Sequence, residues 1–332
     1  MPDFVPVIHG APSDRPDDAD VHSDAAAVAM ALRDCGYTTD IVEVDLDLRE
    51  LERLAVRQPL VVFNLVEATR GDTRLAHLAG AAMDHLGLRY TGAGAMACFL
   101  AGPKMLSKRL MRQSGIATAD WWPDGTGVPA GTRVIIKSEH EHASFGMDRG
   151  SLVAGHDAAR EVAARQSRYG GQFFAEAFLP GREFNISLLQ EGERVRVLPI
   201  PELDFTGMPA KRPRIVDYEA KWRPGSVGYV NTNRRFGVER DEPDLAAHLR
   251  DLALACWECF DLTGYARVDV RLDGAGVPTV LEVNANPCLS PDAGFPATAA
   301  QAGLSYNRLI AAIVAAAVAS QPATSPCFAS AS

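Results

Sequence analysis

The feature that most constrains the fold of this chain is the stretch from Ala266 to Pro291, which reads ARVDVRLDGAGVPTVLEVNANPCLSP. Two apolar-rich runs flank the turn DGAG at residues 273–276, a pattern that is typical of a β-hairpin. Side chains alternate between the two faces of a strand, so Arg267, Asp269 and Arg271 are expected to share one face. The stretch therefore predicts two antiparallel strands with a charged face.

This charged face is a candidate metal site. Glu282 and Asn284 share one face of the second strand, and they converge with Asp269 if the two faces coincide. Mg²⁺ is usually bound by one or two carboxylates together with substrate phosphates. Arg267 beside such a site would meet the charge that develops on a transferring phosphoryl group. The alternative is a surface hairpin with solvated charges, which the apolar run around Glu282 disfavours because unpaired polar groups are costly there.

Length and composition exclude several classes of protein. The chain has 332 residues and 47% hydrophobic residues, which predicts roughly two or three domains with a sizeable core. The net charge of -9 argues against a nucleic-acid binder that relies on bulk charge. The start of the chain has no signal-peptide pattern, and the apolar run at residues 309–319 is too short to span a bilayer. We therefore expect a cytoplasmic protein that binds neither nucleic acid nor membranes.

Strands and helices alternate up to about residue 95, which is typical of a parallel α/β domain. In this part we expect strands at residues 4–9, 41–44 and 60–65 and helices at 24–35 and 76–86. Farther on, we expect strands at 133–138, 151–154, 173–178 and 183–189, and helices at 96–100, 104–114, 157–167, 243–260 and 304–319. Residues 202–236 are irregular, and a long stretch without structure is usually functional or disordered.

Two lysines in separate elements are candidates for phosphate binding. Lys104 begins a basic helix, and Lys137 ends an apolar strand, where a lysine is seldom fully buried without a partner. The alternative for Lys137 is an edge lysine whose charged end reaches solvent. The glycine turn at residues 91–94 can also cradle a phosphate, although the pattern is common.

The polar loop at residues 139–146 reads EHEHASFG and leaves three interpretations open. It is a flap over a ligand, or it presents His140 and His142 to a substrate, or it binds a transition metal. Two histidines supply fewer ligands than the three or four that zinc needs.

The hairpin sequence RVDVRLD…VLEVNANP resembles the metal-binding end of the ATP-grasp ligases, and it is most similar to the D-alanine–D-alanine ligase family. The resemblance extends over roughly residues 90–310. It implies an α/β (α+β) ATP-grasp fold that follows an N-terminal parallel α/β domain. The expected parts are the N-terminal domain at 1–95, a central ATP-grasp subdomain at 96–200, a C-terminal subdomain at 201–319 and a disordered tail at 320–332.

The resemblance also implies a nucleotide site. Lys104 and Lys137 match lysines that contact the α- and β-phosphates, and the flap that closes on the triphosphate includes Ser144 and Phe145. The segment FAEAFLPGREF resembles the hinge that grips adenine and ribose. Its matching positions are three whose backbone meets the adenine edge and one acidic residue on the ribose hydroxyls: Glu176, Ala177, Leu179 and Glu183.

The remaining matched residues belong to catalysis. DYEAKW resembles the loop that carries a lysine, here Lys221, to the γ-phosphate. Two Mg²⁺ ions, with Mn²⁺ as an alternative, would lie at Asp269, Glu282 and Asn284, while Arg267 stabilises the transferring phosphate and the oxyanion. Cys288 matches a glycine whose amide helps to bind that oxyanion. A nucleophilic role for its thiol is a further interpretation, although no His or Asp partner is evident in the sequence.

The amino-acid sites depart from the family's pattern. A Ser–Tyr pair around the first substrate reads Ala143 and Trp222, and the accompanying Glu has Asp20 as its nearest candidate. The Ser–Leu pair that holds the second carboxylate reads Ala293-Gly294. We therefore expect substrates other than two D-alanines.

Together these observations predict an ATP-dependent, ADP-forming carboxylate–amine ligase that works through an acyl phosphate and uses ATP and Mg²⁺. We expect small-molecule substrates and a homodimer. The alternatives are an intramolecular cyclo-ligase, a dipeptide ligase with other substrates, or an ATP-binding module without catalysis, although none of the expected metal ligands is missing. A phosphohistidine relay lacks a histidine within the metal motif.

Overall fold

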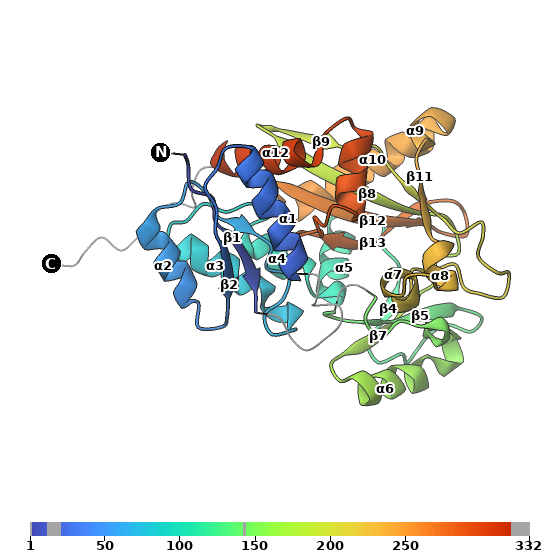
Figure 1. The fold of residues 1–332 in the computed structure, drawn as a ribbon. Helices are drawn as coiled ribbons and strands as arrows, with labels where there is room; N and C mark the ends of the chain where they lie inside the picture. Colours follow the sequence, from blue (N-terminus) through green and yellow to red (C-terminus); the bar gives the residue numbers. More distant parts are fainter. Residues whose placement is uncertain (1, 12–20, 142–143, 320–332) are drawn as a thin grey trace.

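The structure, a computed structural model, describes residues 2–11, 21–141 and 144–319 of the chain. Asp20, His142, Ala143 and the tail at 320–332, which the sequence analysis singled out, lie outside the described residues. The described residues contain three sheets. In Figure 1 a small sheet lies at the left, the largest sheet extends across the upper right, and the third sheet lies below it.

The N-terminal sheet has the strand order β2-β1-β3, and both pairings are parallel. Its strands are β1 (Val7–Gly10), β2 (Ile41–Val44) and β3 (Phe63–Asn64). Its helices are α1 (Val21–Asp34), α2 (Arg49–Arg57) and α3 (Ala76–His85). This confirms the predicted parallel α/β arrangement, whereas α2 was missed because charged residues hide its short apolar stripe of Leu51 and Leu54.

The largest sheet has six strands in the order β11-β10-β8-β12-β13, with β9 paired to β8. Its strands are β8 (Glu183–Glu191), β9 (Arg194–Val197), β10 (Glu202–Asp204), β11 (Asn233–Arg235), β12 (Tyr265–Leu272) and β13 (Pro278–Asn284). The subdomain boundary that the sequence predicts between residues 200 and 201 falls inside this sheet, because β8 and β9 precede it.

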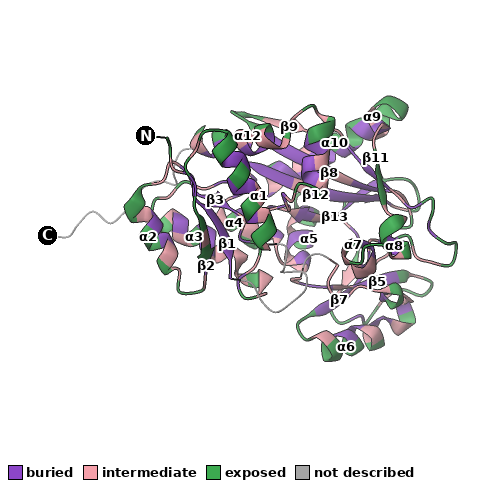
Figure 2. Ribbon diagram, in the orientation of Figure 1, coloured by how far each residue is buried: buried purple, intermediate pink, exposed green. Residues whose placement is uncertain are grey.

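Helices bury the central strands of this sheet, which Figure 2 colours as buried. The helix α10 (Pro243–Cys259) packs Leu249 and Ala253 into the same core as Val268 of β12. Another core joins α1 and α12 (Tyr306–Ala319) to the start of β12, where Tyr265 is fully buried. The sheet that contains the charged hairpin is therefore packed against α10 in one core and against α1 and α12 in another.

The third sheet has the order β4-β7-β5-β6. Its strands are β4 (Trp121–Trp122), β5 (Arg133–Ser138), β6 (Leu152–Ala154) and β7 (Phe173–Ala177). The helix α6 (Ala158–Tyr169) covers it from below in Figure 1, with Val162 packed against Val134 and Phe173. The opposite side of the sheet faces the six-stranded sheet.

Short elements complete the fold. They are α4 (Ala95–Ala101), α5 (Lys104–Gln113), α7 (Tyr218–Trp222), α8 (Val227–Val230), α9 (Val238–Asp241) and α11 (Gly294–Gln301), with 3₁₀ turns at Thr73–Leu75, Arg149–Ser151 and Gly155–Asp157. Residues 202–236, which we expected to be irregular, thus contain two strands and two helices. Elements of three to five residues are too short to show a periodic sequence pattern.

The predicted hairpin is present, and its charged faces coincide. Asp269 pairs with Glu282 and Arg267 pairs with Asn284 across β12 and β13. The register shifts after Asp269, so that Val270 pairs with Val280 and Leu281 is an extra residue in β13. Such a β-bulge bends the strand and redirects side chains, and bulges are common beside active sites.

Within the described residues, no single helix is both long and apolar enough to cross a membrane. The helices α11 and α12 pass that test only as a pair, and they meet at an angle of 101°.

The glycine turn at residues 91–94 supports packing, and Gly92 and Gly94 are not among the residues around the cavity described below. Gly92 lies against Gly264, where an added Cβ would come within 2.9 Å of the Gly92 Cα and N atoms. The Thr263 hydroxyl also donates to the Gly92 carbonyl over 2.9 Å. Two loops therefore meet backbone to backbone just before β12.

Replacing Gly264 with Ala is expected to destabilise the protein. Gly264 has φ +68, and the new Cβ would also clash with the Gly92 backbone. Gly192 is a matched control, because it has φ +64 with no atom within 4 Å of an added Cβ. We expect a loss of about 1 kcal/mol for Gly192→Ala and about 1–3 kcal/mol more for Gly264→Ala in urea unfolding. Equal losses would contradict the close approach of the two loops.

Candidate active site

A cavity of about 920 Å³ lies between the two larger sheets and reaches the N-terminal sheet. Strands β5, β7, β8, β12 and β13 contribute to its wall, together with the segments 65–73, 215–234 and 288–294. Of the residues that the sequence analysis proposed for the site, those that line the cavity are Lys104, Lys137, Ser144, Phe145, Glu176, Ala177, Leu179, Glu183, Lys221, Arg267, Asp269, Glu282 and Cys288. Asn284 is not among the lining residues.

Asp269 is the centre of the hairpin's charged face. Its two carboxylate oxygens accept from Arg267, from Nε over 2.7 Å and from Nη2 over 2.8 Å. Asn185 of β8, its register partner, donates its amide to Oδ1 over 2.8 Å. The carboxylate is thereby fixed in orientation while its cross-strand partner Glu282 faces the same cavity.

The donors on this face suit a hard cation such as Mg²⁺. Asp269 and Glu282 offer carboxylate oxygens toward one cavity, and carboxylate oxygens are ligands that Mg²⁺ prefers. Asn284 lies one pleat farther on, with its Oδ1 accepting from the Asn286 amide over 3.0 Å. No cluster of three or more His, Cys, Asp or Glu side chains suitable for a metal occurs in the described part of the chain. A cation here would therefore also need oxygens from a bound phosphate.

Two lysines converge on Glu176 in the opposite wall of the cavity. Lys137 Nζ lies 2.6 Å from Glu176 Oε1, and Lys108 Nζ lies 2.7 Å from Oε2. The Lys108 and Glu176 side chains are each only 1% exposed. Although burial acts in the other direction, the two ammonium groups hold the pKa of Glu176 below its usual value. The group is a buried triad of one carboxylate and two lysines, in which burial lowers the pKa of Lys108 while Glu176 opposes that shift.

This triad changes the interpretation of Glu176 and Lys137. The Glu176 side chain is committed to the two lysines, so any contact with a nucleotide would come through its backbone. Lys137 is no snorkelling edge lysine, because its ammonium group is directed to a buried carboxylate. The third member, Lys108, was missed because a lysine in the basic run of α5 is ordinarily a solvent-facing residue.

Lys104 and Lys221 approach the hairpin from two other segments. Lys104 is 7% exposed and donates to the Glu141 carbonyl over 2.8 Å. Burial lowers the pKa of Lys104 from its usual value, and Glu282 opposes that shift. Lys221, on α7, faces the cavity, where loss of solvation and Arg267 lower its pKa while Glu282 again opposes the shift. The Glu282 carboxylate therefore interacts electrostatically with both lysines.

The predicted hinge leaves few free backbone donors. The Ala177 amide donates to Asp120 O over 2.8 Å, and the Phe178 amide donates to Arg133 O over 2.9 Å. Leu179, the next residue, lines the cavity. Glu183 lines the cavity and is held by Arg271, whose Nη1 lies 3.1 Å from Glu183 Oε2.

Polar contacts join the flap to the segment that carries Lys221. The Ser144 hydroxyl donates to the Val216 carbonyl over 2.7 Å, and the Tyr218 amide donates to the Met147 carbonyl over 3.1 Å. Ser144 has φ +63, so the chain turns sharply at the point of contact. These contacts support the flap interpretation of the loop.

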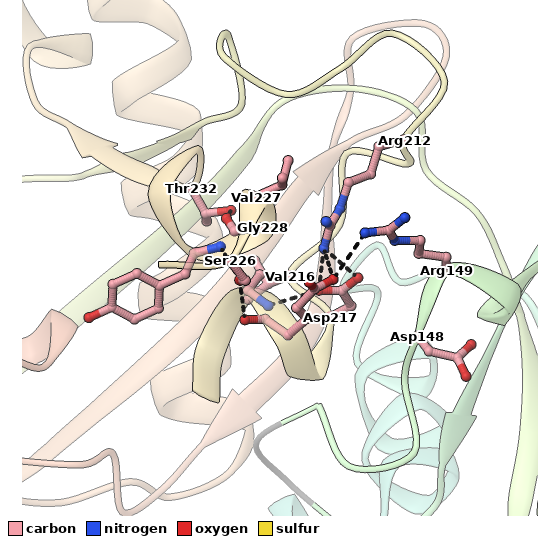
Figure 3. A network of polar contacts seen from close by, with 12 residues as sticks. Asp148, Arg149, Arg212, Val216, Asp217, Ser226, Val227, Gly228 and Thr232 are labelled. Atoms are coloured by element: carbon pink, nitrogen blue, oxygen red, sulfur yellow. Dashed lines mark hydrogen bonds and ion pairs between the residues drawn. The ribbon is translucent and has the colours of Figure 1, made fainter. Parts of the chain in front are cut away.

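A charged network holds this junction together (Figure 3). Arg212 bonds Glu219 over 2.8 Å and Asp217 over 3.1 Å, while Asp217 caps α7 by accepting from the Ala220 amide over 2.9 Å. Arg149, from the third sheet's side, approaches Glu219 within 3.4 Å. Figure 3 shows the two arginines extending toward one group of carboxylate oxygens, of which Glu219 is the partner that they share. The network fixes the helix that presents Lys221.

The far end of the cavity is lined by Asp24, Glu67, Trp222 and Cys288. The Cys288 thiol donates to Asp24 Oδ2 over 3.4 Å, a partner that the sequence analysis did not identify. Burial and the neighbouring carboxylates of Glu67 and Asp24 raise the pKa of Cys288 well above its usual value. The thiol is therefore protonated at neutral pH, which disfavours the nucleophilic interpretation.

His140, one of the two histidines that were considered for contact with a substrate, does not line the cavity. Arg70, beside the cavity-lining residue Gly71, forms an ion pair with Asp45 and does not line the cavity either. The His140 carbonyl accepts from the Thr73 hydroxyl over 2.9 Å, which ties the loop to the N-terminal part of the chain. Burial lowers the pKa of His140 below its usual value.

The sequence analysis missed Lys108, Asn185 and Arg234. Asn185 could have been found, because a lone amide in the apolar strand EFNISLL needs a partner. Arg234 lies in the segment that we expected to be irregular, so nothing indicated which way its side chain points.

Comparison with known families and proteins gives a consistent result. Residues 127–315, more than half of the chain, match the family model described as the D-ala D-ala ligase C-terminus. The uncharacterized protein y4sG of Sinorhizobium fredii is 34% identical over 303 residues, covering 87% of this chain and 86% of that protein. The D-alanine–D-alanine ligase of Synechococcus is 30% identical over 297 residues, covering 86% of this chain and 84% of the relative.

Solved structures agree with the fold. The D-alanine–D-alanine ligase of Bacillus anthracis complexed with ATP has a TM-score of 0.71 at 18% identity, and covers 95% of this chain and 97% of the other. A second structure of that ligase has a TM-score of 0.74 at 19% identity with the same coverage. This likeness confirms the α/β ATP-grasp fold that the sequence resemblance implied.

Replacing Lys108 with Met is expected to destabilise the fold. The change leaves the buried Glu176 with one of its two cations, and removing a partner from a buried ion pair typically costs about 3–5 kcal/mol. Arg109, the exposed neighbour on α5, gives a matched control, and Arg109→Met should change stability by less than about 0.5 kcal/mol. Urea unfolding at pH 7 measures both, and similar losses in the two variants would refute the role of the triad.

Proposed function

This chain belongs to the D-alanine–D-alanine ligase family of ATP-grasp proteins, and we propose that it joins a carboxylate to an amine at the expense of ATP. In the proposed reaction a substrate carboxylate attacks the γ-phosphate and forms an acyl phosphate and ADP. The amine then attacks the acyl carbon, and the tetrahedral intermediate collapses with release of phosphate. The substrates are proposed to differ from two D-alanines.

One observation carries this proposal: cations from three elements and two carboxylates line the same cavity. Lys104, Lys137 and Lys221 approach it from α5, β5 and α7, while Asp269 and Glu282 face it from the hairpin. Phosphoryl transfer needs little covalent chemistry from a protein, because positioning and charge stabilisation supply most of the rate enhancement. A nucleoside triphosphate with a bound divalent cation is the ligand whose phosphate charges these lysines and carboxylates would match.

The lysines are proposed to hold the phosphates in sequence along the cavity. The triad of Lys108, Glu176 and Lys137 keeps the Lys137 ammonium group in place. Lys104, anchored to the Glu141 carbonyl, is directed toward the same region. Lys221, whose pKa is lowered by burial and by Arg267, would gain most from an arriving γ-phosphate. The Leu179 backbone and Glu183 are proposed to meet adenine and ribose.

Arg267 is proposed to act on the transferring phosphoryl group and later on the oxyanion. Its bidentate contact with Asp269 fixes the guanidinium plane beforehand, so little reorganisation is needed during reaction. Asp269 and Glu282, with Asn284 beside them, would hold Mg²⁺, which when bound supplies neutralisation of the phosphate charge. The Cys288 backbone amide is a candidate oxyanion donor, whereas its protonated thiol has no proposed chemical role.

Glu282→Gln is expected to abolish ADP release while the fold is retained. The substitution removes the negative charge that favours the protonated forms of Lys104 and Lys221, and it weakens the proposed cation site. Because such a cation supplies several kcal/mol of transition-state stabilisation, the rate should fall at least about 100-fold. A coupled ADP assay with circular dichroism on each variant tests this. Glu193→Gln, the same change at an exposed turn, is the control and should retain full activity. Normal turnover of Glu282→Gln would refute the proposed cation site.

Efficient D-Ala–D-Ala formation is not expected. Trp222 replaces a hydrogen-bonding Tyr, and Ala293 offers no hydroxyl at the second site. A recognition group left unpaired costs about 1–3 kcal/mol, so two such losses should lower kcat/KM for D-alanine by roughly 10²- to 10⁴-fold relative to the best substrate pair.

The measurement is ADP release with D-alanine, Mg²⁺ and ATP, with mass detection of the product. A panel of amino acids and small carboxylates is tested in parallel to find the preferred pair. If the D-alanine dipeptide forms with a kcat/KM equal to that of the best other pair in the panel, the proposed difference in substrates is wrong.

A further inference from the structure

Glu139, in the loop that follows β5, is a buried acid that the proposed mechanism does not use. The residue is only 4% exposed, and both of its carboxylate oxygens accept from the Met105 amide, each over 3.1 Å. Met105 is the second residue of α5, and the first amides of a helix have no partner within the helix. Pro103, which precedes α5, provides no side-chain cap. Glu139 therefore supplies from another segment the acceptor that an N-cap side chain ordinarily supplies.

The same loop holds both ends of Lys104, the first residue of α5. The Lys104 amide donates to the Glu139 carbonyl over 3.1 Å, and the Lys104 ammonium group donates to the Glu141 carbonyl over 2.8 Å. The loop is itself fixed, because the Glu139 amide donates to the Gln172 carbonyl over 2.9 Å and the Glu141 amide donates to the Ser138 hydroxyl over 3.2 Å. One loop thus positions the backbone and the side chain of Lys104 together.

The surroundings of Lys104 disfavour a cation, and Glu139 offsets this. Lys137 acts on Lys104 as a like charge, and the first turn of α5 has no acidic residue to complement the positive end of the helix dipole. The charged groups that act on Glu139 are Lys104, Lys108 and Arg109, all on α5, so the acid is a counter-charge for this end of the helix. Burial raises the pKa of Glu139 to about 7, against the effects of the Met105 amide and these cations. The protonated acid still has a carbonyl oxygen that accepts a hydrogen bond.

We propose that Glu139 is a positioning residue for nucleotide binding, which fixes the first turn of α5 and thereby directs the Lys104 ammonium group to a phosphate. The inference rests on the proposed ligase function, in which Lys104 binds a phosphate of ATP. Glu139 is not among the residues that line the cavity, so it acts through Lys104 and not on the ligand itself. Without its carboxylate the Met105 amide would lose its acceptor, and the first turn of α5 would open more easily.

The test measures how tightly the full-length protein binds a non-hydrolysable ATP analogue with Mg²⁺, by calorimetric titration. Glu139→Ala should weaken binding by about 3- to 30-fold, since the loss of a helix cap lowers the population of the binding-competent turn. Glu139→Gln should bind within about 3-fold of the wild type, because its side-chain oxygen can accept from the same Met105 amide. Circular dichroism and urea unfolding verify that each variant is folded under the conditions of the titration.

A double variant separates the positioning of Lys104 from a general loss of stability. In a Lys104→Met background, Glu139→Ala should weaken binding by less than about 2-fold more, because the ammonium group that Glu139 positions is absent. Asp124→Ala is the matched control, since Asp124 accepts from the Thr126 amide over 2.9 Å at an exposed turn outside the cavity. It should leave the affinity for the analogue unchanged. With an active substrate pair, Glu139→Ala should raise KM for ATP by about 3- to 30-fold and change kcat by less than about 2-fold.

The positioning role and the ligase reaction fail in different ways. The positioning role is wrong if Glu139→Ala binds the analogue as tightly as the wild type, if Glu139→Gln loses as much affinity as Glu139→Ala, or if the losses of Glu139→Ala and Lys104→Met add in the double variant. Each of these results leaves the ligase reaction standing. Binding that depends on Glu139 as expected, together with no ADP release from any substrate pair, refutes the ligase reaction and leaves the positioning role standing. A wild type that binds no analogue refutes both.

Discussion

The buried ion triad of Lys108, Glu176 and Lys137 is the interaction on which the rest of the cavity depends. A carboxylate that is 1% exposed would be too costly to bury alone, so it requires both ammonium groups. The two lysines come from α5 and β5, and the carboxylate comes from β7. The triad therefore fastens the third sheet to α5, which packs against the hairpin side of the molecule through Met111. One charged contact joins the two walls between which the cavity lies.

The same rule of paired charges explains the opposite wall. Asp269 is held by Arg267 and Asn185, and Glu183 is held by Arg271, so each buried carboxylate has a fixed donor. Among the cations that line the cavity, Lys221 and Arg234 have no such close carboxylate partner within the described residues. Loss of solvation and the neighbouring Arg267 lower the pKa of both, although both residues remain exposed, and an arriving anion would offset the effect of Arg267. The distribution of unpaired charge, more than the shape of the cavity, points to anionic ligands.

Sequence reasoning succeeded where a pattern has a local physical cause. The alternation of the hairpin fixed which charged residues share a face, and the register of Asp269 with Glu282 confirms it. It failed where partners are distant in sequence or where an element is short. The extra residue Leu281 in β13 has no signature in an apolar run, and Lys108 looked like one more basic residue of an exposed helix face. Nothing local marks a lysine whose carboxylate partner lies 68 residues farther along the chain at Glu176.

The proposed phosphate end of the cavity keeps the residue types that the family resemblance implies, whereas the proposed substrate end departs from them, and this difference has a structural basis. The phosphate end is built on sheet strands, and its side chains are locked by buried ion pairs, so a substitution there carries a stability cost as well as a functional one. The substrate end is built from β11, the loop after β13 and the first turn of α11, whose residues are more exposed and take part in fewer ion pairs. The network of Arg212, Asp217 and Glu219, together with the contact of Ser144 with the Val216 carbonyl, ties the Lys221 helix to the loop that carries Ser144. Specificity can therefore change in such a fold while the machinery for phosphoryl transfer stays fixed.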